Sequence, residues 1–306
     1  MSSSDRNKPK NSASSDSTYT VMEFQREFPN DAACLEYLWK QNYSPDGRKA
    51  HCPICDRERS FHKVASRPSW SCDSCGKHIH PTANTIFHKS STSLQLWFYA
   101  IYLMSTTRCG ISAKELERQL GVTYKTAWRM ANLIRNELMS QDDEPLSGDV
   151  EVDETFIGGK PRVWEKKTAW QHRERKAIVM GAVERKGKIK ASVIPHTGGV
   201  VVQGKVHEYV LQGSNLYTDE YPGYSMMSKR GYNHRTVLHK SKIYVQGDVH
   251  TQTIEGFWSH LKNGLRGTHH SVSKKWLQSY VDEFVFRYNN RETNMFRTLL
   301  LRACEA

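Results

Sequence analysis

The sequence contains no apolar run that approaches the roughly 20 residues a helix needs to cross a bilayer. Its first residues, MSSSDRNKPKNSASSDS, also lack the apolar core of a secretory signal. This segment is rich in Ser, Asn and Lys instead, a composition typical of disordered chain. We therefore expect no secretion and no membrane among the partners of the protein.

Cysteine is scarce, and its arrangement argues against a disulfide framework. Of seven cysteines, four form two CxxC pairs and three are scattered. An odd, clustered set of this kind is typical of a metal site in a reducing compartment.

Acidic residues are outnumbered by basic ones, 32 to 44, which gives a formal net charge of +12. A strongly basic chain predicts a polyanionic partner, and nucleic acid is the commonest one.

The 306 residues are enough for two or three domains, and no internal repeat is evident. Composition and periodicity change several times along the chain, and each change marks an expected boundary. We expect six segments: a disordered tail at 1–24, a helix within 25–45, a Cys-rich module at 46–88, a helical region at 89–140, a linker at 141–148 and an α/β domain at 149–306.

The Cys-rich module predicts a zinc site. Its two knuckles, Cys52-Pro-Ile-Cys55 and Cys72-Asp-Ser-Cys75, are separated by 16 residues. Each knuckle can present two thiolates to one ion, and four thiolates complete a tetrahedral structural site. The nearby histidines are therefore expected to be surface or packing residues: His51, His62, His78 and His80.

Residues 112–135 predict two helices that meet at Gly121, in the manner of a helix–turn–helix. Thr123 can cap the second helix, which then presents Lys125, Arg129 and Arg135 outward, as a reader of the major groove would. An ordinary helical hairpin with a basic face is the alternative. The expected buried seam comprises Leu116, Leu120, Val122, Ala127, Met130 and Ile134.

From residue 149 the pattern predicts an α/β domain with a mixed sheet. Five segments are rich in β-forming residues: DVEVDETFI, KAIVMGAVE, KIKASVIPH, NLYTD and HRTVLH. A helix is expected between the third and the fourth, at VQGKVHEYVL, and two more at about 252–265 and 275–289.

Two of the predicted strands carry aspartates near their ends, Asp153 and Asp219. Each aspartate is followed by a glutamate, Glu154 or Glu220, so strand geometry alone leaves a one-residue ambiguity at both sites. In the first strand, alternation groups three acids on one face: Asp149, Glu151 and Asp153.

A third acid, Glu255, opens a predicted amphipathic helix. Its polar face continues through Ser259, Lys262 and Arg266, so a carboxylate and a lysine lie two turns apart on one side. A surface helix with a solvated Glu/Lys face is the alternative. The apolar stripe beside it comprises Ile254, Phe257, Trp258, Leu261 and Leu265. Carboxylates from two strands and one helix could hold two divalent ions for phosphoryl transfer.

The chain resembles the ISXO2-like (IS1595) transposases, to which the eukaryotic Merlin transposases are related. The motifs that carry the resemblance are VEVDETFIGGK, YTDEYPGY, HTQTIEGFWSHLKNGLRGTHHSVS and DEFVFRYNNR. FPNDAACLEYLW, the two CxxC pairs and TIFHKSSTSLQLWFYAIYLM extend it over roughly residues 25–295.

The resemblance implies an RNase H-like catalytic domain preceded by a zinc ribbon and a helix–turn–helix-like domain. It implies a catalytic triad of Asp153, Asp219 and Glu255 that holds two Mg²⁺ (or Mn²⁺) ions, with Lys262 beside it. His250 could approach the scissile phosphate, although such a residue more often caps or packs. Zn²⁺ would be a single structural ion.

The implied activity is binding of transposon ends, DNA cleavage and strand transfer, with double-stranded DNA as partner and a homodimer or larger assembly on DNA. The implied location is the cytoplasm, with the nucleoid, or the nucleus in a eukaryotic host. Two alternatives remain: an RNase H-like nuclease or resolvase that cuts without joining, and a domesticated zinc DNA-binding protein.

Overall fold

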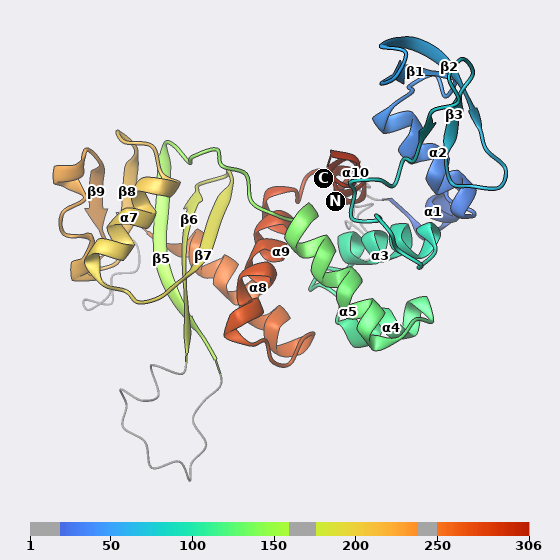
Figure 1. The fold of residues 1–306 in the computed structure, drawn as a ribbon. Coiled ribbons are helices and arrows are strands. Elements are labelled where there is room, and N and C mark those ends of the chain that lie inside the picture. Colours follow the sequence, from blue (N-terminus) through green and yellow to red (C-terminus); the bar gives the residue numbers. More distant parts are fainter. Residues whose placement is uncertain (1–18, 159–175, 238–249, 306) are drawn as a thin grey trace, which may run out of the picture. The chain divides into compact units, whose positions relative to one another are not determined.

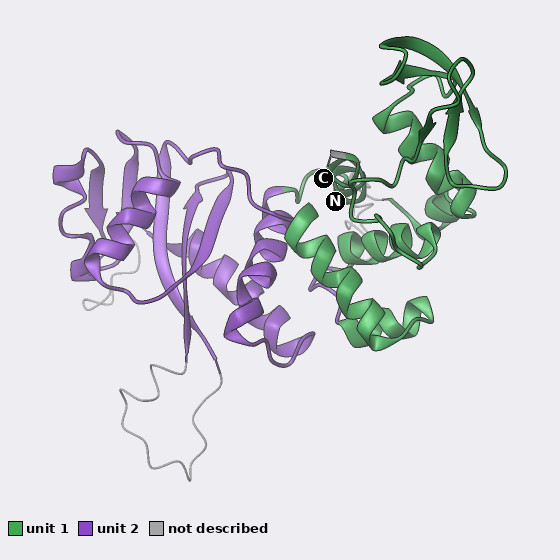
Figure 2. Ribbon diagram, viewed as in Figure 1, with its two compact units in different colours: residues 1–107, 113–138, 290–306 green, residues 108–112, 139–289 purple. Residues whose placement is uncertain are grey.

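The computed structural model describes residues 19–158, 176–237 and 250–305 (Figure 1). The chain divides into two compact units (Figure 2). Unit 1 comprises residues 1–107, 113–138 and 290–306, and unit 2 comprises residues 108–112 and 139–289. Most of the expected disordered tail lies outside the described residues, but its last four positions belong to a helix that starts at Val21.

Unit 1 contains six α-helices among its described residues. They are α1 (Val21–Glu27), α2 (Asp31–Asn42), α3 (Leu94–Thr106), α4 (Ala113–Leu120), α5 (Tyr124–Leu133) and α10 (Met295–Glu305). Asn30 caps α2, because its side-chain oxygen accepts a hydrogen bond from the backbone N–H of Ala33 at 3.0 Å. The helix predicted within 25–45 is thus confirmed.

The C-terminal helix α10 is part of the core of unit 1. Phe296 is 1% exposed, and its ring lies against those of Phe24 and Tyr102, from α1 and α3. Arg297 also makes a two-pronged ion pair with Glu27, at 2.6 and 2.5 Å. Residues 290–306 therefore fold with unit 1, whereas the sequence pattern extends the α/β domain to residue 306.

The Cys-rich module folds as a small antiparallel sheet in the order β1-β2-β3-β4. Its strands are Lys49–Cys52, Arg57–Lys63, Trp70–Cys72 and His78–Ile79. The indole of Trp39 on α2 stacks on that of Trp70 on β3, with ring centroids 4.8 Å apart. This contact joins the sheet to α2 through a shared apolar core.

Helices α4 and α5 meet at a tight turn, as predicted. Gly121 has a φ of 64°, a left-handed conformation that glycine adopts without strain. The Thr123 hydroxyl accepts a hydrogen bond from the backbone N–H of Thr126 and caps α5. Most of the predicted seam is buried, with Val122 only partly so.

Arg135 is buried and 2% exposed, so the prediction that it faces outward is wrong. The last turn after α5 is π-helical, from Ile134 to Leu138. Regular helical spacing accounts for the burial of Arg135, which lies four residues after the buried Ala131, on the same face, and about 120° around the helix from Arg129.

Unit 2 is built on a five-stranded mixed sheet in the order β7-β6-β5-β8-β9. The strands are β5 (Asp149–Ile157), β6 (Ala177–Glu184), β7 (Ile189–Ile194), β8 (Asn215–Thr218) and β9 (Asn233–Thr236). The first three pair antiparallel, whereas β8 and β9 run parallel to β5. The mixed α/β sheet predicted from residue 149 is confirmed; the end of the fifth predicted segment, residues 238 and 239, lies outside the described residues.

Two apolar cores cover the two faces of this sheet. On one face, α7 (Gly199–Tyr209) packs on side chains of β5 and β6 such as Val152 and Met180. On the other, α8 (Gln252–Gly267) and α9 (Leu277–Asn289) pack on Val179 and Ala191. Each side chain of β5 is consequently assigned to a face by strand alternation.

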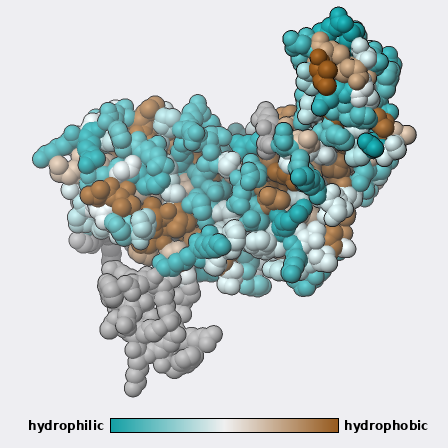
Figure 3. Space-filling model, viewed as in Figure 1, coloured by the Kyte–Doolittle hydropathy of each residue, from teal (hydrophilic) through white to brown (hydrophobic). Residues whose placement is uncertain are grey.

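The face shown in Figure 3 is largely polar. Figure 3 shows apolar side chains gathered over α7, where Val200 is 85% exposed. Among the described residues, no helix has the length and apolar character needed to cross a membrane.

Candidate functional site

Strand alternation along β5 separates Asp153 from Glu154. Asp153 faces α8, because its Oδ2 accepts a hydrogen bond from the indole N–H of Trp258 at 2.9 Å. Glu154 faces the opposite side of the sheet, where its Oε1 accepts a hydrogen bond from the Tyr224 hydroxyl at 2.7 Å. Since α8 carries Glu255, this geometry favours Asp153 over Glu154 as the partner of that acid.

Asp153 is largely buried, and this burial disfavours the ionised form of its carboxyl. Burial raises the pKa of its carboxyl to about 6. The backbone N–H of Glu154 and the indole of Trp258 oppose the rise, whereas the charges of Asp219 and Glu255 add to it. A cation bound beside Asp153 would stabilise the ionised form of this carboxyl.

A glycine on the neighbouring strand makes room for the Trp258 indole. Gly181 on β6 lies opposite Asp153 in the sheet register. A Cβ at Gly181 would come within 2.8 Å of Cη2 of Trp258, closer than van der Waals contact permits. The absence of a side chain at this position lets the indole cross the strand and reach the carboxylate.

Asp219 follows the last residue of β8 and is partly buried. Its Oδ1 accepts a hydrogen bond from the backbone N–H of Tyr221 at 3.0 Å. Strand β8 runs parallel to β5, with Tyr217 opposite Glu151. Asp219 and Asp153 each come two residues later, so they lie toward the same end of the two neighbouring strands. The neighbouring Glu220 is also partly buried.

Glu154 is a second protonatable acid near the site. Burial raises its pKa to about 7, against the hydrogen bond from Tyr224, and the charges of Asp153 and Asp219 add to the rise. Acidic side chains therefore lie on both faces of β5, with Asp153 on one and Glu154 on the other.

Helix α8 presents its two stripes as predicted. Its apolar stripe is buried in the core of unit 2. Glu255 and Arg266 are exposed and Lys262 is partly buried on the other stripe. Burial lowers the pKa of Lys262, Arg266 and Lys176 lower it further, and Asp153 opposes them.

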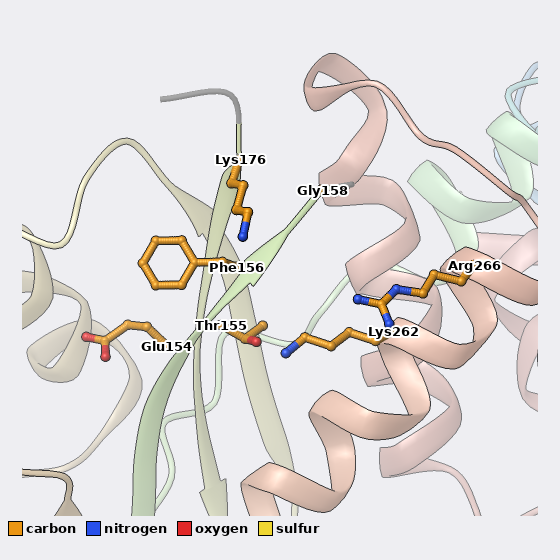
Figure 4. Close-up of a pocket in the computed structure, with 7 residues that line it drawn as sticks. All are labelled: Glu154, Thr155, Phe156, Gly158, Lys176, Lys262 and Arg266. Atoms are coloured by element: carbon orange, nitrogen blue, oxygen red, sulfur yellow. The ribbon is translucent and has the colours of Figure 1, made fainter. Parts of the chain in front are cut away.

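Lys262 and Arg266 also line an open pocket of about 590 Å³ between the end of β5 and α8. Figure 4 shows Lys262 reaching from α8 toward Thr155, with Lys176 and Phe156 nearby. Three cationic side chains and a partly exposed aromatic ring are suited to a phosphodiester chain.

The three acids supply hard oxygen donors, the ligand type that Mg²⁺ and Mn²⁺ prefer. Their donor atoms are not gathered as tightly as those of the cysteines. Within the described parts of the chain, the cysteine cluster is the one group of three or more His, Cys, Asp or Glu ligands whose atoms all lie within 4.8 Å of one another.

The structure brings the four knuckle cysteines together: Cys52, Cys55, Cys72 and Cys75. A tetrahedral zinc site with Zn–S distances of about 2.3 Å separates its sulfur atoms by roughly 3.8 Å, which matches this spacing. The two knuckles also share one turn geometry. The residues that follow them, Asp56 and Gly76, have φ values of 50° and 71°.

In each knuckle the backbone N–H of that following residue donates to the carbonyl of the first cysteine, Cys52 or Cys72. Although desolvation opposes it, backbone N–H groups of Cys55 and Ile54 lower the pKa of Cys52 to about 6. The donor set and its spacing thus suit a zinc ion. None of the four nearby histidines, all of them described, belongs to the cluster.

Lys125 and Arg129 are exposed on α5. They belong to unit 1, whereas the acids, Lys262 and Arg266 belong to unit 2. The exposed pair keeps the helical spacing of i and i+4, so both side chains lie on one face of α5.

The sequence patterns missed two contributors to the site in unit 2. Trp258 belongs to the apolar core, as predicted, but its indole N–H also binds Asp153. Glu151 is fully buried and binds the start of α8. An acid in a strand otherwise rich in valine was the available signal for Glu151, whereas no local pattern marks Trp258.

Comparison with known proteins agrees with this geometry. Residues 145–289 match the model of the ISXO2-like transposase domain. The chain is 26% identical over 256 residues to a Halobacterium salinarum protein named "Uncharacterized protein in transposable element ISH50", covering 78% of this chain and 84% of that protein. No solved structure matches the chain. Residues 145–289 are therefore an ISXO2-like (IS1595) DDE transposase domain, and the chain is a distant homologue of the ISH50 protein.

Proposed function

We propose that this protein is a DNA transposase that binds the terminal inverted repeats of a transposon, cleaves DNA at them and joins the ends to target DNA. The observation that supports the proposal is the placement of the three acids: Asp153 lies on β5, Asp219 directly follows the parallel neighbour β8, and Glu255 lies in the first turn of α8, which packs on the Asp153 face of β5. These elements lie in a domain matched to transposases of the DDE type.

In this proposal Asp153, Asp219 and Glu255 hold two Mg²⁺ or Mn²⁺ ions. When bound, such ions supply Lewis-acid activation of the attacking oxygen and stabilise the leaving oxygen of an in-line displacement. The Trp258 indole keeps one oxygen of Asp153 oriented by its hydrogen bond. Lys262 and Arg266, in the pocket beside β5, neutralise DNA phosphates.

Unit 1 supplies DNA recognition in the proposal. Residues 46–88 form a zinc ribbon around one structural Zn²⁺, and residues 89–140 form a helix–turn–helix-like domain. Lys125 and Arg129 on α5 contact DNA. Residues 141–148 link this region to the catalytic domain. Two ends must be held together during transposition, so the active form on DNA is a homodimer or larger.

The test is a gel assay with end-containing DNA, a target plasmid and Mg²⁺. We expect joined products from the wild type, whereas Asp153→Asn, Asp219→Asn and Glu255→Gln should bind the ends but give no joining. Glu154→Gln and Glu220→Gln are the matched controls, because each removes the neighbouring acid, and both should retain joining.

The products also separate the proposal from its alternatives. Nicked ends without joined products would indicate a nuclease or resolvase, and end binding without any cleavage would indicate a DNA-binding protein. Joining at the wild-type rate by any of the three triad variants would show that the triad is wrongly assigned.

A further inference from the structure

Glu151 is a fully buried carboxylate that the proposed chemistry does not use. It lies on β5, two residues before Asp153 and on the same face of the sheet. A buried carboxylate is costly unless several donors surround it. Both of its oxygens are engaged, so we do not expect Glu151 to serve as a metal ligand.

The donors to Glu151 come mainly from the first turn of α8. Its Oε2 accepts from the backbone N–H groups of Thr253 at 2.9 Å and Ile254 at 3.2 Å. Its Oε1 accepts from the Thr253 hydroxyl at 3.0 Å. These residues are 102 and 103 positions away in sequence.

Glu151 therefore acts as the N-terminal cap of a helix to which it does not belong. The residue at the local cap position, Thr251, makes no side-chain capping bond. The first N–H groups of a helix lack partners within the helix, and its positive dipole end favours an anion. A carboxylate from β5 satisfies both requirements and fixes where α8 begins relative to that strand.

Arg185, just after β6, extends this linkage to the second catalytic strand. Its Nε donates to Glu151 at 2.9 Å, and its guanidinium lies 4.2 Å from the ring centroid of Tyr217 on β8. Its Nη2 also donates to the carbonyl of His250, which precedes α8, at 2.9 Å. The Nδ1 of His250 lies 3.1 Å from Glu151.

Three residues of this cluster each lie two positions before an acid of the triad. Glu151 precedes Asp153, Tyr217 precedes Asp219 and Thr253 precedes Glu255. A cluster that joins the three residues also restrains the relative positions of the three acids, because the two members of each pair are only two positions apart along the chain.

We propose that Glu151, held by Arg185, is a positioning residue that fixes the spacing of Asp153, Asp219 and Glu255 by capping α8 from β5. This inference rests on the proposed function for the role of the three acids. The cap itself is a structural feature that can be tested without activity.

The first experiment measures hydrogen exchange by mass spectrometry in the full-length protein, wild type and Glu151→Gln. Glutamine keeps the size of the side chain but removes its charge and turns one acceptor into a donor. We expect the amides of Thr253 and Ile254 to exchange about tenfold faster or more, since hydrogen bonds to a charged group are lost.

The second experiment measures strand transfer by the same variant as a function of Mg²⁺ concentration. Residues that orient metal ligands typically change metal affinity or activity by about 10- to 100-fold. We expect a drop in rate of that order and a higher Mg²⁺ concentration for half-maximal activity. A merely structural role would lower the folded fraction and leave the Mg²⁺ midpoint unchanged.

Glu283→Gln is the matched control. Glu283 is as buried as Glu151 and lies in the same unit, but its ion-pair partner, Arg287 at 2.8 Å, lies one turn away on the same helix. This variant should leave the exchange of the first turn of α8 and the Mg²⁺ midpoint at their wild-type values.

Thr253→Val is the second test and applies even if Glu151→Gln does not fold. It removes one hydrogen bond to Glu151 and keeps the carboxylate and both backbone bonds, so we expect smaller changes of about threefold in the same directions. Wild-type exchange at Thr253 and Ile254 in the folded Glu151→Gln variant, or in Thr253→Val, would overturn the proposed cap.

Faster exchange with an unchanged Mg²⁺ midpoint would confirm the cap but refute the positioning role. If the wild type itself joins no DNA, the proposed function fails, whereas the exchange result still decides whether Glu151 caps α8.

Discussion

Replacing Gly181 with alanine tests how tightly Asp153, the first acid of the proposed triad, is packed. The new Cβ would lie 2.8 Å from Cη2 and 3.1 Å from Cζ2 of Trp258, and 3.2 Å from the carbonyl oxygen of Lys190. The carbonyl belongs to the paired strand β7 and cannot retreat far, so the indole must move.

Two opposing effects set the size of the change. Adding a methyl group to a filled core costs about 1–3 kcal/mol. Alanine also restricts the unfolded chain, which stabilises the protein by about 0.4–1 kcal/mol where the backbone conformation is ordinary. The packing effect is larger, so we expect Gly181→Ala to lower the free energy of unfolding by roughly 1–2 kcal/mol.

The displaced indole should also affect catalysis, because Trp258 would no longer donate to Asp153 with its present geometry. We expect slower strand transfer with end binding intact. Urea unfolding of the full-length protein and the gel assay for joined ends measure the two effects separately.

A double-mutant cycle with Trp258→Phe identifies the cause. Phenylalanine lacks the atoms that the new Cβ would meet, so the alanine should cost less in its presence, with a coupling energy of about 1 kcal/mol or more. Gly204→Ala in α7 is the control, because nothing lies within 4 Å of its Cβ position and alanine favours a helix. Wild-type stability of Gly181→Ala, or strict additivity with Trp258→Phe, would refute the reasoning.

Three further predictions concern zinc and DNA. Cys52→Ser should release zinc and weaken end binding. Cys109→Ser, at an exposed cysteine outside the cluster, should keep a full zinc content. Elemental analysis of the purified variants measures the zinc content of each. Lys262→Ala should slow strand transfer and reduce the salt dependence of DNA binding by about one counterion, and an unchanged slope would exclude a phosphate contact. Lys125→Ala with Arg129→Ala should weaken binding to transposon ends by tenfold or more in a gel-shift titration; if the two residues read bases, binding to unrelated DNA should fall less.

The regular elements of unit 2 were predictable because each is encoded locally. The segment 149–157 forms β5 with the predicted limits, and the apolar stripe of α8 is buried as its spacing indicated. These patterns depend on neighbours within one or two turns. They could not show which face of β5 meets α8, and for that reason the strand pattern alone left Asp153 and Glu154 equivalent, so that only the family resemblance favoured Asp153.

Most of the features that escaped prediction depend on residues distant in sequence. The bond from Glu151 to Ile254 spans 103 positions, and no local pattern reports such a contact. Arg135 is a different case: its spacing of four residues from the buried Ala131 already indicated an inward position, which the prediction overlooked. The helix α10 packs with α1 and α3, which is a consequence of tertiary contacts between aromatic rings far apart in the chain.

The place of α10 in unit 1 has a consequence for the order in which the protein is made. Residues 139–289 leave the ribosome before α10, so unit 2 has its sheet and helices available while unit 1 still lacks Phe296. Domains usually complete their folding from the N-terminus onward during synthesis. Here the transposase domain can be complete first, and Phe24 on α1 and Tyr102 on α3 lack their contacts with Phe296 until α10 emerges. A nascent chain is thus unable to finish unit 1 before residues 139–289 have been made.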